Sequence, residues 1–131
     1  MSHYTTIKTQ LIAAEIIKQA LEEMGFTVKC GSNLPLYDYM GSKRSLTADM
    51  VISRNQLSTV SNDIGLKKAG ESYQVIISDY DSAATKTKDF VRQLQQKYAY
   101  LKVKKELANT HFTVVNEYVH KDGTVQIVAE R

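Results

Sequence analysis

Residues 63–79 read DIGLKKAGESYQVIISD and contain two runs of alternating apolar and polar side chains on either side of a short link. The two runs, Asp63 to Lys68 and Tyr73 to Asp79, have the period of β-strands that are buried on one face. The link, Ala69 to Ser72, contains a glycine and has the length and composition of a hairpin turn. This stretch therefore predicts an antiparallel β-hairpin.

Other segments have the alternation, or the β-branched and aromatic content, of strands. They are His3 to Lys8, Phe26 to Cys30, Ala48 to Arg54, Phe112 to His120 and Thr124 to Glu130. The last two flank Asp122-Gly123, a strong signal for a tight hairpin turn. Residues 31–47 lose any apolar period and contain Gly, Ser, Asn and Pro, so we expect the longest loop of the chain there.

Apolar residues at helical spacing predict a first helix from about Gln10 to Met24. Thr9 is placed to cap its start, and Gly25 is suited to the left-handed conformation that ends a helix. The pattern of residues 20–28, a helix end followed by a strand, is repeated in residues 106–114. This echo indicates either a duplicated helix–strand unit or the convergence of two junctions of the same kind.

A second helix is predicted after Asp81-Ser82, a pair that is suited to capping a helix start. Its apolar stripe runs from Phe90 to Leu101. Val103 and Leu107 fall well off this stripe when the helix is continued. We therefore expect a bend or break in the helix between Tyr98 and Leu101.

The length of 131 residues, with 43% hydrophobic and 24% charged residues, is typical of one globular domain. We predict a single domain over residues 1–131 with an α+β fold. Its sheet is mostly antiparallel, with about six or seven strands and two or three helices on one face, because hairpins dominate the predicted connections. A ferredoxin-like core is one arrangement that would fit.

The first residues lack the basic start and apolar run of a signal peptide, and no stretch approaches the ~20 apolar residues that span a bilayer. Cys30 is the only cysteine, which excludes an intramolecular disulfide and a Cys-x-x-Cys site. We therefore expect a cytoplasmic protein that does not associate with membranes.

Six blocks in this order resemble a known family. They are Ser2 to Thr9, Leu36 to Gly41, Ser61 to Gly65, Ser78 to Asp81, Gln96 to Tyr100 and Asp122 to Thr124. Together they are similar to the hypothetical chloroplast reading frame thirty-five family, a domain of unknown function found in cyanobacteria, algal plastids and related phages. The resemblance implies a location in a cyanobacterial or host cytosol, or in the plastid stroma. It is weaker after Tyr100, where family members often have a histidine and this chain has Leu101.

The segment from Leu36 to Arg44 is the best candidate for binding a ligand or a partner. Tyr37 and Tyr39 are followed there by Lys43 and Arg44, on the other side of Gly41, so the segment could stack rings and contact phosphate oxygens. It lacks the preceding glycine of a Walker phosphate loop. The plainer alternative is a tyrosine-anchored loop that covers the sheet. Tyr100, outside this segment, is a further candidate partner anchor.

A second set of candidates is polar. Asp79 and Asp81 would share one side of a strand, and with Asp63 they could offer oxygen ligands to Mg²⁺, although helix capping and turn formation explain the aspartates more simply. His3 lies on an early strand that could sit beside them and act as an acid or base. Asn62 completes this possible functional cluster. The sequence predicts no cofactor and no defined metal site, because no HExxH or related spacing occurs.

No complete catalytic constellation is present, and whether the protein is an enzyme stays open, with the balance against it. We favour a non-catalytic interaction or assembly module that binds an unidentified protein partner. The alternative is a domain that binds nucleic acid or a phosphate ligand, either with or without Mg²⁺. Basic residues are concentrated in residues 86–106, which indicates either a positive patch or an ordinary solvated helix face. An exposed sheet edge could also support a homo-oligomer.

Overall fold

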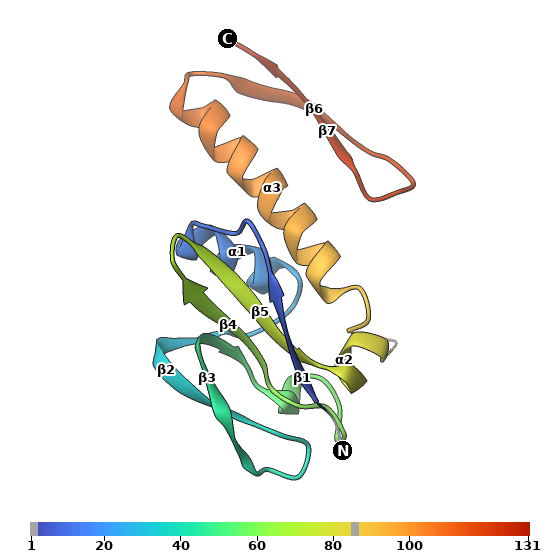
Figure 1. Cartoon of the computed structure of the whole chain (residues 1–131). Helices are drawn as coiled ribbons and strands as arrows, with labels where there is room; N and C mark the ends of the chain where they lie inside the picture. The colour runs from blue at the N-terminus through green and yellow to red at the C-terminus, as the bar shows by residue number, and fades with distance from the viewer. Residues whose placement is uncertain (1–2, 85–86) are drawn as a thin grey trace.

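The structure, a computed structural model, describes residues 3–84 and 87–131. It contains a five-stranded antiparallel sheet, a separate two-stranded hairpin, and helices, as the sequence predicts for an α+β fold (Figure 1). In chain order the elements are β1 (Tyr4–Lys8), α1 (Ala14–Glu23), β2 (Lys29–Tyr37), β3 (Lys43–Ile52), the 3-10 helix η1 (Arg54–Gln56), β4 (Ile64–Ala69), β5 (Ser72–Ser78), α2 (Asp79–Ala83), α3 (Phe90–Asn109), β6 (Thr113–Val119) and β7 (Val125–Glu130).

The larger sheet has the strand order β1-β5-β4-β3-β2, and each neighbouring pair is antiparallel. The hairpin predicted from residues 63–79 forms β4 and β5 in the centre of this sheet, where Leu66 pairs with Val75. Strands β2 to β5 follow one another as a meander, and α1 connects β1 to β2, which are the two edges of the sheet. The connectivity therefore differs from the two split β-α-β units of a ferredoxin-like core.

The main core lies between α1, α3 and one face of the sheet. Ile17 and Leu21 of α1 and Leu94 of α3 are completely buried there. A smaller core on the opposite face contains Leu36, Ala48, Val51 and Ile76. It forms because the first half of β3 pairs only with β2, so this part of the sheet extends past β4 and packs over it.

Gly65 of β4 is required by the close packing of the smaller core. A Cβ atom at this position would lie 2.7 Å from the Cβ atom of Ala48 and 3.0 Å from a methyl carbon of Leu36. Contacts this short force the neighbouring strand to move. The glycine therefore lets β2 and β3 pack directly onto β4.

The loop predicted for residues 31–47 is wrong, because most of this stretch forms β2 and β3. The apolar period is lost because β2 is an edge strand whose pairing with β3 is irregular between Cys30 and Leu34 and again between Pro35 and Tyr37. Asn33, inside the first irregularity, has a positive φ of 52°. An edge strand tolerates both a proline and a bulge, so turn-forming residues are poor guides here.

The start of α1 also differs from the prediction, since the helix begins at Ala14 instead of near Gln10. The hydroxyl of Thr9 bonds the backbone of Tyr73 and Leu11 and does not cap the helix. The hydroxyl of Tyr98, on α3, accepts hydrogen bonds from the N–H groups of Ile12 (3.2 Å) and Ala13 (3.0 Å). A distant side chain therefore satisfies backbone donors just before the helix.

Helix α3 is continuous from Phe90 to Asn109, so the predicted bend between Tyr98 and Leu101 is wrong. Of the two off-stripe residues, Val103 lines a groove beside the hairpin β6–β7, and Leu107 is half-buried. One helix therefore carries two apolar stripes, one for the main core and one for the hairpin. The predicted hairpin around Asp122-Gly123 is confirmed, with Gly123 at a φ of 89°.

Both long helices end in the same hydrogen-bonding motif, which accounts for the echo between residues 20–28 and 106–114. The N–H of Phe26 bonds the carbonyl of Leu21 at 3.1 Å, and the N–H of Phe112 bonds the carbonyl of Leu107 at 2.9 Å. This is the Schellman arrangement, with a left-handed residue just before the phenylalanine. Gly25 fills that position after α1, whereas His111 fills it after α3 with a φ of 65°.

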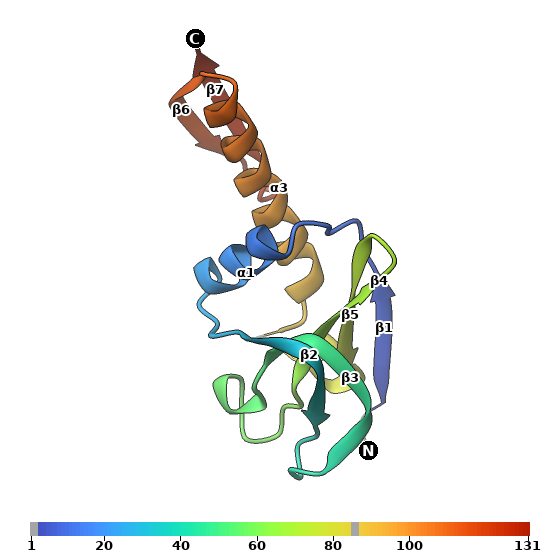
Figure 2. The ribbon, with the colours of Figure 1, turned by 90° about the vertical axis from the view of Figure 1, so that its left-hand side faces the viewer.

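The second half of α3 and the hairpin extend past α1 and away from the larger sheet (Figure 2). We call residues 102–131 the arm and the preceding described residues the body. Leu101 is the last buried residue of the chain, and no side chain in the arm is buried. None of the helices in the described residues is long and apolar enough to cross a membrane.

Candidate functional site

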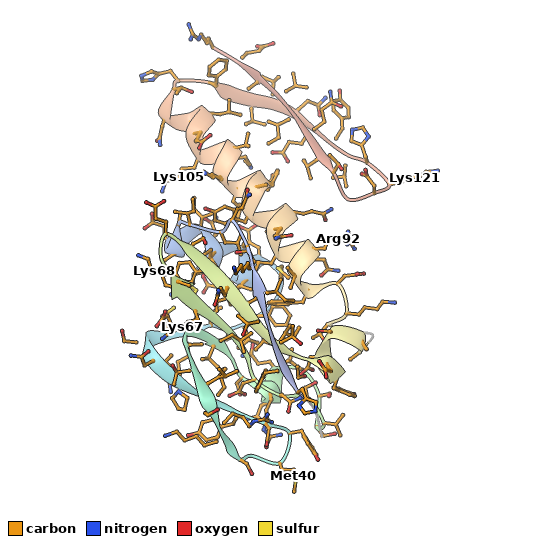
Figure 3. All side chains as sticks on the ribbon, in the orientation of Figure 1. Met40, Lys67, Lys68, Arg92, Lys105 and Lys121 are labelled. Atoms are coloured by element: carbon orange, nitrogen blue, oxygen red, sulfur yellow. The ribbon has the colours of Figure 1, made fainter. Side chains whose placement is uncertain are left out.

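The predicted candidates are distributed over two ends of the molecule. Met40, at the tip of the β2–β3 turn, and Lys121, at the tip of the β6–β7 hairpin, lie at opposite ends (Figure 3). Tyr37, Tyr39, Lys43 and Arg44 belong to the first end, whereas Tyr100 lies on α3 beside the hairpin. The structure therefore does not join Tyr100 to the other candidate binding residues.

A buried polar cluster lies under the β2–β3 turn, and we call it the polar clasp: Asn62, Asp63, Ser78 and Asp81. All four are at most 5% exposed. Asn62 and Asp63 precede β4, Ser78 ends β5, and Asp81 lies in α2. Three of the five residues predicted as a functional polar cluster are therefore close together.

Asp63 holds backbone from two different segments. Its Oδ2 accepts a hydrogen bond from the N–H of Tyr37 (2.9 Å), and its Oδ1 accepts one from the N–H of Arg54 (2.8 Å). Its own N–H and carbonyl bond the carbonyl of Tyr37 and the hydroxyl of Tyr4. Burial, together with the negative charge of Asp63, raises the pKa of Tyr4 well above its ordinary value, so this hydroxyl stays protonated as a donor.

Asp81 forms the other half of the clasp. Its Oδ2 accepts hydrogen bonds from the hydroxyl of Ser78 (2.7 Å) and the N–H of Asn62 (3.0 Å). The Oγ of Ser78 in turn accepts the N–H of Asp81 at 3.1 Å, so Ser78 caps α2. The side-chain oxygen of Asn62 accepts the N–H of Tyr39 at 2.9 Å. The clasp thus links α2 to the β2–β3 turn through Asn62.

His3 and Asp79 do not join the clasp, since both are exposed. The expectation that Asp79 and Asp81 share one side of a strand is wrong, because both lie in α2. The carboxylate of Asp79 accepts a hydrogen bond from the hydroxyl of Thr5 at 3.3 Å. His3 contributes its backbone carbonyl to the N–H of Asp79. Within residues 3–84 and 87–131, no group of three His, Cys, Asp or Glu side chains is placed to hold a metal ion.

The β2–β3 turn has a fixed backbone and an exposed surface. Asp38 accepts hydrogen bonds from the N–H groups of Met40 and Ser42, both at 3.0 Å. The guanidinium of Arg44 lies 5.2 Å from the centre of the Tyr4 ring and 3.7 Å from the carboxylate of Asp38. Tyr37 is 41% exposed and Met40 is 74% exposed. The turn therefore presents apolar and aromatic surface, while Arg44 makes contacts inside the protein.

A cavity of about 360 Å³ lies on the outer side of β2 and β3, next to this turn. Leu34, Pro35 and Val51 line it, and Asp63 reaches its inner end. Both carboxylate oxygens of Asp63 already accept backbone hydrogen bonds, which limits what they can offer a ligand. The cavity is therefore mainly an apolar depression, and the carboxylate at its inner end is already engaged in hydrogen bonds.

A groove with a volume of about 810 Å³ lies at the other end, between α3 and the hairpin. Val103 of α3 and Val119, Val125 and Ile127 of the hairpin give it apolar walls. Val119 is 76% exposed, the highest value of any large hydrophobic side chain in the described residues. The groove is therefore an unfilled apolar surface.

Tyr100 is part of the wall of this groove. Its hydroxyl bonds the two carboxylate oxygens of Glu117 at 2.9 and 2.7 Å, and the ammonium of Lys104 lies 3.2 Å from the same hydroxyl. Hydrogen bonds from Tyr100 and Lys104 lower the pKa of the Glu117 carboxyl, and the same contacts raise the pKa of Lys104. Tyr100 therefore attaches β6 to α3, a role that the sequence did not indicate.

The basic residues of α3 do not form one positive patch. Arg92, Lys97, Lys104 and Lys105 each lie within salt-bridge distance of an acidic side chain: Asp89, Glu23, Glu117 and Glu15 respectively. Two of these acids come from α1 and one from β6. Three of the four partners lie outside residues 86–106, so counting charges along that stretch could not reveal their neutralising contacts.

The groove was missed by reasoning from the sequence, although one signal was present. Val103 and Leu107 lie off the core stripe of α3, a pattern that from sequence alone predicts a break in the helix. In a continuous helix the same pattern requires a second apolar partner. The alternating valines of residues 113–119 and 125–130 supply that partner, but its open groove follows only from the packing geometry.

The fold and these sites define a small α+β protein in which buried polar side chains bond backbone and one another, and in which a groove with apolar walls lies between α3 and the hairpin. Residues 20–128 match a family described as protein of unknown function DUF1257, and the chain belongs to that family. It is 29% identical to an uncharacterized protein ycf35 of Guillardia theta and 28% identical to one of Cyanophora paradoxa, over 100% of this chain and 98% of each relative. An uncharacterized protein ycf35 of Pyropia yezoensis is 25% identical with the same coverage. No solved structure matches the chain.

Proposed function

We propose that the protein is a non-catalytic interaction module that binds a protein partner in the groove between α3 and the hairpin. The observation that carries this proposal is the groove of about 810 Å³ with apolar walls from α3, β6 and β7. Contiguous exposed apolar surface on a globular protein marks interaction sites. Val119 is 76% exposed, which is unusually high for an apolar strand residue on the side of the strand that faces a helix.

The lining of the groove also suits a protein ligand. Its apolar walls are flanked by polar side chains, among them Gln93, Gln96 and Lys97 on the α3 side and Glu117 on the hairpin. Protein interfaces have this anatomy of an apolar centre and a polar rim. An amphipathic helix, with its apolar face toward Val103 and Val119, is the partner element that such a groove accommodates.

The polar clasp supports the non-catalytic part of the proposal. Asp63 accepts two backbone N–H groups, and Oδ2 of Asp81 accepts bonds from Ser78 and Asn62. A general acid or base must reach a substrate proton from an accessible position. Asn62 and Asp81 are both completely buried, so we assign the clasp to holding the β2–β3 turn and α2.

The test is affinity purification of the tagged chain from native cell lysate, with and without nuclease, followed by mass spectrometry. Val119→Glu places a charge in the groove, and Val115→Glu is the matched control on the same strand, since Val115 is 48% exposed and does not line the groove. We expect a nuclease-resistant protein that is recovered with wild type and with Val115→Glu but lost with Val119→Glu.

Two results would contradict the proposal. Repeated recovery of no protein from the native lysate would argue against a stable partner. Equal loss with Val119→Glu and Val115→Glu would show that the groove is not the binding surface, provided that circular dichroism shows both variants folded. Loss with Tyr37→Ala combined with Tyr39→Ala, but not with Val119→Glu, would move the site to the β2–β3 turn.

A second candidate function is binding of nucleic acid or a phosphate ligand at the β2–β3 turn. It is favoured by the exposed Tyr37 and Lys43 on a turn whose backbone is fixed by Asp38. Binding would weaken with added salt, because neutralised phosphates release counterions. Unchanged fluorescence anisotropy of labelled single-stranded DNA and RNA at low salt would exclude nucleic acid, and absence of heat on titration with Mg²⁺ would exclude a magnesium-dependent version.

We further propose that the protein acts in a cyanobacterial or host cytosol, or in the plastid stroma. The similarity to ycf35 proteins of Guillardia theta and Cyanophora paradoxa supports this location. Fractionation of the native cells followed by immunoblotting tests it, and recovery of the chain only with pelleted membranes would contradict it.

A further inference from the structure

Strand β7 has an unpaired edge that lacks the usual obstacles to further pairing. It pairs with β6 on one side, and no other strand of the described residues pairs with it. Between Val125 and Ala129 it contains no proline, glycine or charged residue. Natural proteins protect an exposed edge with such residues or with a bulge. The edge of β7 is therefore open to another strand.

The other strand edges in the molecule carry those obstacles. The pairing of β6 is irregular between Val114 and Asn116. Strand β2 contains Pro35 and two irregularities in its register. Strand β1 has only five residues, with Lys8 at its end just as Glu130 is at the end of β7. Bulges, prolines and short charged strands each discourage edge-to-edge pairing, so β7 differs from the rest.

The hairpin is also incompletely covered on its outer face. Val125 and Ile127 line the groove, so the alternating residues Gln126 and Val128 face the other way. Tyr118 and Val128 on this outer face are 49% and 37% exposed. A two-stranded hairpin is only marginally stable in water, and additional strands stabilise it.

We propose that β7 pairs antiparallel with β7 of a second copy of the chain, around a twofold axis at Val128, to form a four-stranded sheet from two hairpins. A closed twofold interface uses the same surface on both subunits. This inference goes beyond the partner-binding role, because it concerns self-association through the strand edge and leaves the groove open.

The register at Val128 follows from the residues of β7 and the residue after it. Val128 then lies opposite its symmetry mate, Ile127 lies opposite Ala129, and Gln126 lies opposite Glu130. All residues from Val125 to Arg131 find a partner, and no two like charges are opposite each other. Moving the axis to Ile127 shortens the overlap within β7, because Glu130 and Arg131 would then face residues that precede the strand. Moving the axis to Ala129 places Ile127 opposite Arg131.

Disulfide crosslinking tests both the pairing and its register. Cys30 is the only cysteine, so Cys30→Ser gives a thiol-free background. In that background Val128→Cys would place two thiols on directly opposite residues, where antiparallel Cα atoms are ~4.5–5.5 Å apart and a disulfide can form. Val115→Cys is the matched control, because Val115 is an exposed valine of the same hairpin on β6.

We expect mild oxidation of the purified full chain to convert Cys30→Ser/Val128→Cys to a covalent dimer at micromolar concentration, and Cys30→Ser/Val115→Cys to remain largely monomeric. Equal crosslinking of the two variants, or crosslinking of Val115→Cys alone, would overturn the proposal. Circular dichroism confirms beforehand that both variants keep the wild-type fold.

Sedimentation equilibrium of the unmodified chain gives an independent measurement. We expect a dimer that Val128→Lys weakens on the order of tenfold, because two lysines would face each other across the axis, and that Val115→Lys leaves within about twofold of wild type. A wild-type chain that stays monomeric over the whole concentration range would overturn the proposal. This experiment contains no partner, so its failure leaves the groove proposal standing, and the lysate experiment fails or succeeds separately.

Discussion

Leu94 and Leu107 lie on the same helix, yet Leu94 is completely buried in the body and Leu107 is only partly covered in the arm. The body has two cores and a buried polar clasp, whereas the arm has a hairpin attached to α3 through the Tyr100 network and the hairpin tip. One continuous helix therefore belongs to the buried core over its first half and carries mostly exposed surface over its second half.

The largest expected effect is a difference in the free energy of unfolding between alanine variants of these two leucines. Leu94→Ala should lower the free energy of unfolding by about 2–5 kcal/mol, because it leaves a cavity in the main core. Leu107→Ala removes the same atoms from a partly exposed site and should cost roughly 1 kcal/mol. Urea unfolding followed by circular dichroism measures both. Equal losses would mean that the arm is packed as firmly as the body.

The two aspartates of α2 give the next contrast. Asp81→Ala removes the acceptor of the N–H of Asn62 and of the Ser78 hydroxyl, and buried donors without a partner cost about 1–3 kcal/mol. Asp79→Ala changes an exposed side chain and should stay within about 0.5 kcal/mol of wild type. The same urea measurement applies. A larger loss for Asp79→Ala would show that the clasp does not hold α2.

The local parts of the structure could be predicted from sequence. The two hairpins follow from alternation around Gly70 and Gly123, and both glycines have positive φ. The core stripe of α3 follows from helical spacing, and Leu94 and Tyr98 are buried as it requires. Such predictions succeed because the signal lies within a few residues of the structure that it specifies.

Predictions failed where distant residues decide the structure. Strand β2 depends on Leu36 packing against Ala48 and Gly65, and its own residues resemble a loop. Ser78 ends β5 and caps α2, so the alternation through Asp79 and Asp81 was extended one element too far. Asn62, Asp63 and Asp81 lie close together, but the partners of these hydrogen bonds are 9 to 26 residues apart in sequence, and a sequence pattern does not reveal such bonds.

Removing the hairpin tests whether the body folds independently of the arm. A chain that ends at Asn109 keeps every buried residue, since the last one is Leu101. We expect it to fold cooperatively with a loss of roughly 1–2 kcal/mol, because Tyr100 and Leu107 lose partial cover. Urea unfolding and a heteronuclear NMR spectrum of the body residues measure the result. A disordered product would show that body and arm are one cooperative unit.

The shared helix ending provides a finer contrast between body and arm. Gly25→Ala should destabilise the protein by about 1 kcal/mol, because an L side chain is strained at a φ of 97°. His111→Gly relieves the same strain at a φ of 65° and should stabilise by about 0.5–1 kcal/mol, reduced by the entropy of glycine in the unfolded chain. Thermal unfolding of the two variants measures the opposite signs. Destabilisation by His111→Gly would show that the His111 side chain contributes contacts of its own.

The smallest expected effect concerns pH and the attachment of the arm. Hydrogen bonds from Tyr100 and Lys104 lower the pKa of Glu117 in the folded protein below its ordinary value of 4.5. The stabilisation is therefore fully present above that value and is lost as the pH falls through the lowered pKa.

Glu117 is exposed, so solvent screens the effect, and we expect it in the local stability of the hairpin and not in global unfolding. Amide hydrogen exchange of β6 and β7, corrected for the intrinsic pH dependence, should accelerate as the pH falls below the ordinary value of 4.5 in wild type but not in Glu117→Gln. Equal acceleration in the two proteins would assign the change to other groups, and the attachment of the hairpin to α3 would then depend on apolar residues of the groove such as Val103.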